Sequence, residues 1–142
     1  MRAKGSKDGS TGVSFLGHYD WMSMQQVDEA AQKFAKSMMR HNLCPKVRGE
    51  ERDWNFLGIW SKNRWEWTAT LLACMHYNVT TVGFYDAMGA EQVEYILNQT
   101  EMTSIVCAAE YAKKIIKMKK EGMAAHITSI VLMTGESLDA ET

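Results

Sequence analysis

From residue 54 onward, short apolar runs alternate with longer stretches in which apolar positions recur every three or four residues. A short apolar run rich in β-branched residues is typical of a buried strand, and the wider spacing is typical of an amphipathic helix. The runs predict strands over residues 56–60, 79–84, 103–107 and 127–133. The stretches between them predict helices over residues 64–77, 89–100 and 110–121.

This alternation of strand and helix predicts an α/β fold. Consecutive parallel strands are joined by right-handed crossovers, which place the connecting helices on the faces of the sheet. We therefore expect a mostly parallel sheet with helices packed on it.

Upstream of the alternation the pattern predicts one helix. Apolar positions at helical spacing run through residues 24–41. The preceding "YDWMS" (19–23) resembles a short strand. Residues 42–53 are predicted to form a loop, because Pro45 and Gly49 interrupt any regular element.

The two ends of the chain are polar. The opening "MRAKGSKDGSTG" (1–12) is rich in glycine and serine, which predicts a flexible tail. Residues 136–142 are also polar. The predicted domain therefore spans residues 13–135, with a tail on each side.

Composition is ordinary for one globular domain: 142 residues, 46% hydrophobic and 23% charged. A net charge of -1 argues against nucleic acid as a partner, because a nucleic-acid-binding domain is usually strongly basic. No stretch reaches the ~20 apolar residues of a membrane-spanning helix. The first residues lack the apolar region of a signal peptide, so we expect an intracellular location.

Neither the cysteines nor the histidines show the spacing of a metal site. The three cysteines are odd in number and form no C-x-x-C pair, so we expect them to be reduced and buried. The four histidines show no ligand spacing either. The sequence therefore predicts no metal ligand.

The turn between the first predicted strand of this alternation and its helix carries a candidate capping box. In that interpretation the Asn63 side chain accepts from the backbone N–H of Glu66, and the Glu66 carboxylate reaches back. The turn is then purely structural. The alternative is that Trp65 and Trp67 line a ligand cleft.

A second turn, "FYDAMGAEQ" (84–92), lies where open α/β sheets bind ligands, after a strand and before a helix. Asp86 and Gly89 are candidate caps for that helix. No G-x-G-x-x-G or G-x-x-x-x-G-K-[ST] motif occurs, and one glycine exposes too few backbone N–H groups to cradle a phosphate. We therefore interpret this turn too as structural.

The segment "KKIIKMKKE" (113–121) concentrates five lysines. Lys113, Lys117 and Lys120 fall on one face of the predicted helix. A solvated helix face is the usual meaning of such a pattern. The alternative is a peripheral contact with anionic lipid, in which Lys114 would also take part.

Several separated motifs together resemble one known family. "YDWMS" followed by "GIWSKNRWEW", "FYDAMG" and "ILNQTE" are similar, in order and spacing, to the N-terminal part of long-chain fatty acyl-CoA synthetases. These enzymes belong to the AMP-binding, adenylate-forming superfamily. The matching positions to which we give weight are Tyr19, Trp21, Asn63, Arg64, Glu66, Trp67, Tyr85, Asp86 and Gly89. The resemblance implies that the chain forms a partial N-terminal subdomain of the adenylate-forming fold.

The chain departs from the family pattern at both turns. Trp65 stands where the family has a proline that starts the helix, and Gly83-Phe84 stands where it has Pro-Leu. Ala87-Met88 replaces the usual Thr-Leu. We expect Gly83 to loosen the strand end that precedes the second turn.

The resemblance also implies a chemistry whose motifs are absent from these 142 residues. The family uses ATP, Mg and coenzyme A to convert a fatty acid into its acyl-adenylate and then its acyl-CoA. It does so with a T-S-G-[TS]-T-G-x-P-K loop, a Tyr-Gly-x-[ST]-E segment, a ribose-binding Asp and a distal Lys. "MTGES" (133–137) lacks the second glycine and the lysine of the loop. We therefore assign no catalytic, cofactor-binding or metal-binding residue, and expect no cofactor in this chain.

Two functions follow from the resemblance. The first is a truncated, ligase-like pseudoenzyme that serves as a structural or interaction subunit of a larger assembly. The second is the N-terminal fragment of an active long-chain fatty acid–CoA ligase. Other protein subunits are the expected partners, and the five tryptophans and eleven methionines predict an apolar patch over residues 54–90. A lipid contact through Lys113, Lys114, Lys117 and Lys120 remains open. By resemblance the location is cytoplasmic or on mitochondria, endoplasmic reticulum or peroxisomes.

Overall fold

The computed structural model describes residues 20–133, 135, 137 and 138. The elements, in chain order, are α1 (Met24–Arg40), β1 (Lys46–Arg48), β2 (Asp53–Trp60), α2 (Trp65–His76), β3 (Thr80–Phe84), α3 (Ala90–Thr100), β4 (Ser104–Cys107), α4 (Ala109–Lys120) and β5 (Ser129–Leu132). The predicted tails lie outside the described residues, apart from Ser137 and Leu138. Tyr19 also lies outside them.

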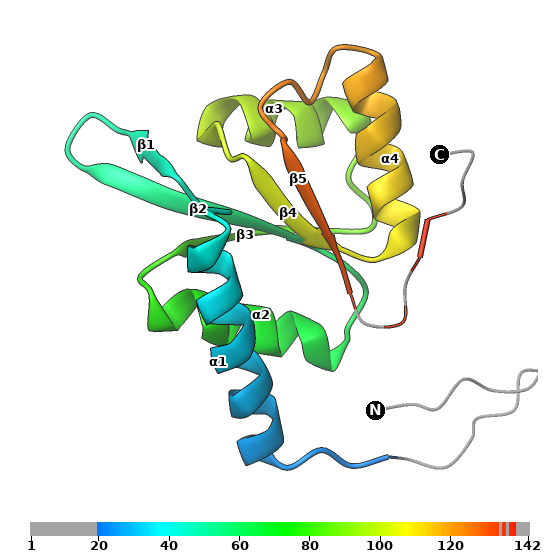
Figure 1. The fold of residues 1–142 in the computed structure, drawn as a ribbon. Coiled ribbons are helices and arrows are strands. Elements are labelled where there is room, and N and C mark those ends of the chain that lie inside the picture. The colour runs from blue at the N-terminus through cyan, green and yellow to red at the C-terminus, as the bar shows by residue number, and fades with distance from the viewer. Residues whose placement is uncertain (1–19, 134, 136, 139–142) are drawn as a thin grey trace, which may run out of the picture.

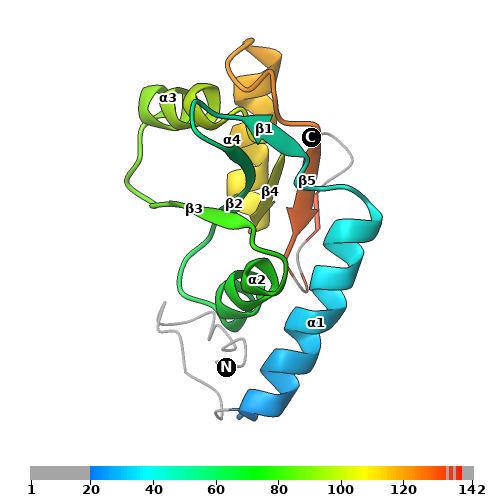
Figure 2. The same ribbon diagram turned by 90° about the vertical axis from the view of Figure 1, so that its left-hand side faces the viewer.

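The prediction of a mostly parallel sheet is confirmed. Strands β3 and β4 both pair with β2 in parallel, and β5 pairs with β4 in parallel. The parallel strands therefore lie in the order β3-β2-β4-β5, with β1 antiparallel to the start of β2. Helices α1 and α2 cover one face, and α3 and α4 cover the other (Figures 1 and 2).

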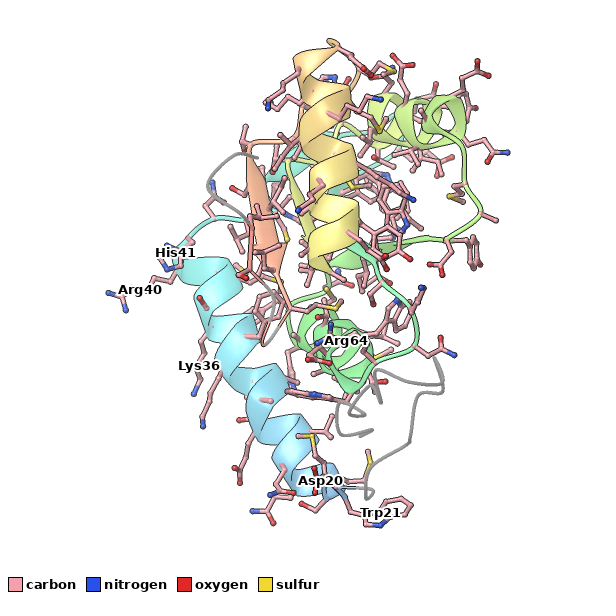
Figure 3. The ribbon with its side chains drawn as sticks, turned by 90° about the vertical axis from the view of Figure 1, so that its right-hand side faces the viewer. Asp20, Trp21, Lys36, Arg40, His41 and Arg64 are labelled. Atoms are coloured by element: carbon pink, nitrogen blue, oxygen red, sulfur yellow. The ribbon has the colours of Figure 1, made fainter. Side chains whose placement is uncertain are left out.

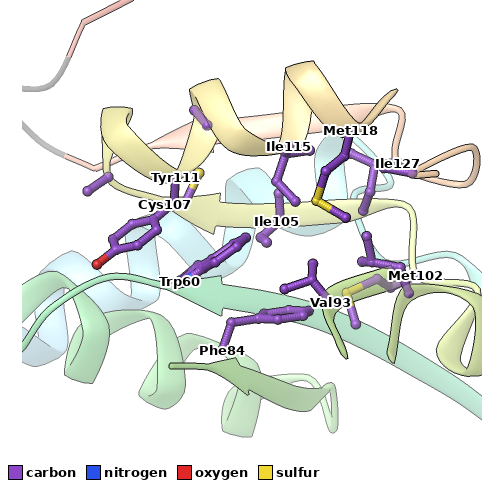
Figure 4. Packing of buried hydrophobic residues seen from close by; sticks show 14 residues of the cluster. Trp60, Phe84, Val93, Met102, Ile105, Cys107, Tyr111, Ile115, Met118 and Ile127 are labelled. Carbon is purple, nitrogen blue, oxygen red and sulfur yellow. The ribbon is translucent and has the colours of Figure 1, made fainter. Parts of the chain in front are cut away.

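The main hydrophobic core lies between the sheet and helices α3 and α4 (Figure 4). Trp60, at the end of β2, stacks between Phe84 of β3 and Tyr111 of α4, with ring centroids 5.5 and 4.9 Å apart. On the other face, α1 packs on α2 through small residues, among them Ala31 and Ala69. The Trp60 stack thus anchors α4 to β2, the central strand.

The region before β2 differs from the sequence prediction in two ways. Residues 20–23 form no strand; Ser23 instead caps α1, its hydroxyl accepting from the Gln26 N–H at 3.1 Å while Gln26 Oε1 accepts from the Ser23 N–H at 2.7 Å. The predicted loop over residues 42–53 contains β1, which forms a hairpin with an earlier start of β2. β1 is short and mostly exposed, so it lacks the apolar run that marks the other strands.

Close packing at Gly58 fixes the centre of the sheet. A Cβ built at Gly58 would lie 3.0 Å from the Ile105 side chain, 3.0 Å from the Met102 sulfur and 3.1 Å from the Phe84 ring. A side chain at this position would push neighbouring core residues apart. The glycine therefore serves packing, not backbone freedom.

Candidate functional site

The two turns singled out in the sequence meet in one cleft. It lies at the carboxyl ends of β2 and β3 and has a volume of about 900 Å³. Its lining residues are Ser61, Lys62, Asn63, Trp67, Gly83, Phe84, Tyr85, Asp86 and Ala87. We call it the carboxyl-edge cleft.

The first wall of the cleft is the turn from β2 into α2, and it is held by an ion pair. The Arg64 guanidinium donates to both carboxylate oxygens of Glu66, at 2.8 and 3.2 Å. The Glu66 side chain is only 9% exposed. A charged carboxylate at this burial needs such a partner, because its desolvation would otherwise be unfavourable.

This ion pair replaces the capping box predicted over Asn63 and Glu66. The helix begins one residue later than that prediction requires, with Arg64 at the N-cap, and the Arg64 side chain makes no capping hydrogen bond. The Glu66 carboxylate is turned toward the guanidinium and not toward the backbone of Asn63. The prediction was wrong because sequence spacing alone did not show that Arg64 would compete for the carboxylate.

Trp65 and Gly83, the two departures from the family pattern, leave regular elements in place. Trp65 is the first residue of α2, and it packs toward α1 instead of lining the carboxyl-edge cleft. The strand β3 keeps its parallel register to its end, with Gly83 opposite Ile59 and Phe84 opposite Trp60. The expected loosening at Gly83 therefore does not break the strand pairing.

The second wall is the turn after β3, which is tied to helix α4. The Tyr111 hydroxyl donates a hydrogen bond to Oδ1 of Asp86. Burial, together with this bond, raises the pKa of Tyr111 above its ordinary value. Asp86 therefore does not cap α3; that helix begins after Gly89, whose N–H donates to the Gln92 side chain at 3.2 Å.

A cationic side chain lies over the aromatic stack behind this wall. Lys114 Nζ is 5.5 Å from the Trp60 ring centroid and 5.1 Å from that of Tyr111. Both distances fall within the range of a cation–π contact. The sequence did not predict that Trp60, Tyr111 and Lys114 would stack, because they come from two elements that are distant in the chain.

A second, smaller crevice lies between the carboxyl ends of β2 and β4, where the strand order reverses. It is lined by Lys62, Arg64, Ala108 and Glu110 and has a volume of about 310 Å³. Lys62 Nζ lies 3.9 Å from a Glu110 carboxylate oxygen across it. Open α/β sheets commonly bind ligands at such a position, but here the charges pair with each other.

The side chains of the carboxyl-edge cleft can position a chain segment but offer little chemistry. Asp86, the one carboxylate among its described lining residues, already accepts a hydrogen bond from Tyr111. Among residues 20–133, 135, 137 and 138, no group of three or more His, Cys, Asp or Glu side chains could hold a metal ion.

The three cysteines are buried, as predicted. Burial raises the pKa of Cys44 to about 11 and that of Cys74 to about 12. Since the thiolate is the reactive form, these two thiols are poor nucleophiles near neutral pH.

The structure brings only part of the motif set together. Asn63, Trp67, Tyr85 and Asp86 line the cleft. Arg64 and Glu66 fix its first turn, and Gly89 starts the helix after its second. Trp21 instead lies at the free end of α1, apart from Arg64, with 86% of its surface exposed (Figure 3).

The length and composition of the helices bear on whether the chain could cross a membrane. Within the described part of the chain, no helix combines the length and the apolar character that crossing a membrane requires.

The fold is an open, mostly parallel α/β sheet with helices on both faces, and several of the motif residues lie in the turns at its carboxyl edge. The match to the family described as AMP-binding enzyme extends over residues 2–142. This chain belongs to that family. Its similarity to long-chain fatty acyl-CoA synthetases is thereby confirmed, as is the assignment to the N-terminal region of the adenylate-forming fold.

The chain is also similar in sequence to individual long-chain-fatty-acid–CoA ligases. The chain is 28% identical over 116 residues to long-chain-fatty-acid–CoA ligase 5 of Rattus norvegicus, covering 81% of this chain and 16% of that protein. It is 30% identical over 88 residues to long-chain-fatty-acid–CoA ligase 6 of Homo sapiens, covering 62% of this chain and 12% of that protein. The chain thus spans about a sixth or less of the length of these relatives.

Solved structures show the same fold at low identity. The Mycobacterium tuberculosis fatty acyl CoA synthetase matches 93% of this chain with a TM-score of 0.65 and 15% identity, and 24% of that chain is covered. The A domain of carboxylic acid reductase from Segniliparus rugosus matches 95% of this chain with a TM-score of 0.70 and 17% identity, and 21% of that chain is covered.

Proposed function

We propose that this chain is a non-catalytic scaffold and interaction unit with the fold of an acyl-CoA ligase N-terminal region. One observation carries the proposal: among the described residues that line the carboxyl-edge cleft, Asp86 is the one carboxylate, and it accepts a hydrogen bond from Tyr111. Phosphoryl and adenylyl transfer depend on donors that are preorganised around the phosphates. These 142 residues contain no glycine-rich phosphate loop that would supply them.

A role in interaction is supported by an apolar groove on the face of the sheet that α1 and α2 cover. The groove has a volume of about 410 Å³ and lies between α1, α2 and the end of β5. Phe34, Trp65, Val131 and Met133 are among its walls. Contiguous apolar surface of this kind is typical of a site where another polypeptide packs.

The proposal is tested with an ATP–pyrophosphate exchange assay on the purified 142-residue protein with a long-chain fatty acid. We expect no exchange above background. A full-length long-chain fatty acid–CoA ligase in the same buffer is the positive control, and circular dichroism shows whether the 142-residue protein is folded. Fatty-acid-dependent exchange by the folded protein would contradict the proposal.

The second candidate is that these residues form the N-terminal part of an active long-chain fatty acid–CoA ligase. The observation that favours it is coverage, because the chain aligns with 16% of the rat relative. The intact mass of the native protein separates the two candidates. A mass near 16.1 kDa favours the scaffold, whereas a several-fold larger mass favours the ligase.

Whether a protein partner covers the groove is a separate question. We expect native material to sediment as a complex larger than 16.1 kDa. A stable, soluble monomer in native extracts would contradict the interaction role, although the lack of adenylation could still hold.

A further inference from the structure

Helix α3 carries a shallow apolar depression on its outer side. The depression has a volume of about 400 Å³, and its lining residues are Met88, Glu91, Gln92, Tyr95 and Ile96. Gln92 lies three and four residues before Tyr95 and Ile96, so these three side chains are neighbours on the helix surface. The depression therefore follows the direction of the helix.

The depression is open to a partner. Val93 and Leu97, on the other side of α3, are buried in the main core, so the helix is held with its outer side turned away from the sheet. Tyr95 keeps 67% of its surface exposed, although it is a large aromatic side chain. In Figure 2, α3 lies at the periphery of the molecule, and none of the described elements covers its outer side.

The same helix carries negative charge without a matching cation. Glu91 lines the depression, and Glu94 precedes Tyr95 in the chain. Helix α3 contains no lysine or arginine. Among the residues that the structure describes, neither glutamate forms an ion pair. We call Met88, Glu91, Glu94, Tyr95 and Ile96 the α3 docking face.

We propose that the α3 docking face binds a basic amphipathic helix of a partner protein. An apolar side chain of that helix enters the depression, and lysines or arginines one turn away meet Glu91 and Glu94. An arginine that lies over the exposed Tyr95 ring adds a cation–π contact. A depression that follows α3 suits a second helix, because helices pack by fitting side-chain ridges into grooves.

The charge of this face argues against other occupants. In a two-fold dimer the same patch meets itself, so a second copy of the chain would bring Glu91 and Glu94 against identical carboxylates. Like charges across an interface repel each other. Nucleic acids and anionic membranes are disfavoured for the same reason. The proposal goes beyond the scaffold function, and it depends neither on whether the chain is catalytic nor on what covers the groove between α1 and α2.

The experiment is a fluorescence anisotropy titration of two labelled peptides with the 142-residue protein. Both peptides are amphipathic sequences of about 18 residues, long enough to form a helix in water. The first has leucines on its apolar face and arginines on its polar face. The second has glutamine in place of each arginine.

Two variants change the face, and each has a matched control. Glu91→Gln/Glu94→Gln is compared with Glu50→Gln/Glu51→Gln on the β1–β2 hairpin, where both glutamates are exposed. Each pair removes two negative charges and takes the formal net charge from -1 to +1. Tyr95→Ala is compared with Tyr95→Phe, which keeps the ring.

We expect the arginine peptide to bind and the glutamine peptide to bind about tenfold more weakly, because each exposed ion pair contributes a factor of a few. Glu91→Gln/Glu94→Gln should weaken binding of the arginine peptide by about fivefold to tenfold. Tyr95→Ala should weaken it by about tenfold, since the ring contact is lost. Both control variants should stay within about twofold of the unmodified protein. Unchanged thermal midpoints without peptide verify that all variants fold.

Several results would overturn the proposal. Equal weakening by the two glutamine variants would show an effect of bulk charge. Equal binding of the two peptides would show that charge complementarity plays no part, and full binding by Tyr95→Ala would place the peptide elsewhere on the protein. Absence of saturable binding at low salt would rule out a basic helix on this face. Self-association that Tyr95→Ala abolishes would make a second copy of the chain the occupant instead.

Discussion

The Tyr111 hydroxyl donates its hydrogen bond to Asp86 across the end of β2, and so joins the first turn of α4 to the turn that follows β3. The bond closes the aromatic stack that Trp60 forms with Phe84 and Tyr111. Because β3 and β4 flank β2 on opposite sides, this contact ties together both halves of the carboxyl edge.

Tyr111→Phe should lower the free energy of unfolding by about 1–3 kcal/mol, since it removes a hydrogen bond to a charged group and leaves a carboxylate without its donor. Urea denaturation followed by circular dichroism measures the change. Retention of full stability would show that water replaces the hydroxyl at no cost.

The same pair predicts a pH dependence at the alkaline end. The pKa of Tyr111 is higher in the folded protein than the ordinary value of about 10. Its contribution to stability is therefore complete below pH ~10 and is lost as the pH rises above it, because the unfolded chain then releases a proton that the folded one keeps. Tyr111→Phe should show a smaller loss of stability between about pH 10 and pH 12 than the unmodified protein. Identical pH profiles would contradict the shift.

Glu66→Gln should destabilise the protein by about 2 kcal/mol, because it leaves the partly buried Arg64 guanidinium without its anionic partner. Glu91→Gln is the matched control: Glu91 is also in the first turn of a helix, but it is exposed. The control should change stability by no more than about 0.5 kcal/mol. If both variants lose equal stability, the effect comes from the helix dipole and not from the ion pair.

Alanine substitution at two glycines of the sheet should have opposite effects. Gly58→Ala should cost about 1–3 kcal/mol, because its Cβ would come within 3.0–3.1 Å of three core side chains. Gly83→Ala should stabilise by about 0.5–1 kcal/mol, because its Cβ would meet only the Trp67 ring, at 3.8 Å, and would reduce the freedom of the unfolded chain. Thermal melts of the two variants decide the signs. A lower thermal midpoint for Gly83→Ala would contradict the prediction, because it would show that an added Cβ is not tolerated beside the Trp67 ring.

Trp65→Phe should leave stability unchanged or raise it by up to about 1 kcal/mol. The Trp65 indole N–H is buried and has no hydrogen-bond acceptor among the residues that the structure describes. Phenylalanine keeps most of the packing against α1 while it removes that donor. Trp65→Ala should lose about 2 kcal/mol through lost packing at a half-buried site. A large loss in the phenylalanine variant would indicate that the N–H has a partner, such as a bound water.

Periodicity predicted the four parallel strands, the three crossover helices and α1, because each has an apolar pattern that is set by burial on a sheet face. It did not predict β1, whose alternating exposed residues pair at the edge of the hairpin without a core face of their own. The sequence predicted that the motif turns lie at the carboxyl edge of the sheet, but it did not predict which side chains hold those turns in place. Arg64 took the carboxylate of Glu66, and Tyr111 reached Asp86 from 25 residues away, and both outcomes depend on tertiary geometry.

The position of β2 between β3 and β4 has a consequence for how the chain acquires its structure. Phe56 pairs with Thr80, 24 residues later, whereas Gly58 pairs with Ile105, 47 residues later. The loop that closes the first ladder is shorter, and loop closure costs more entropy as the loop grows. During synthesis on the ribosome, β2 and β3 can pair while β4 is still inside the exit tunnel. The strands that α1 and α2 cover can therefore form before α3 and α4 pack on the other face. A nascent chain arrested after β3 would then expose the edge of β2 that later pairs with β4.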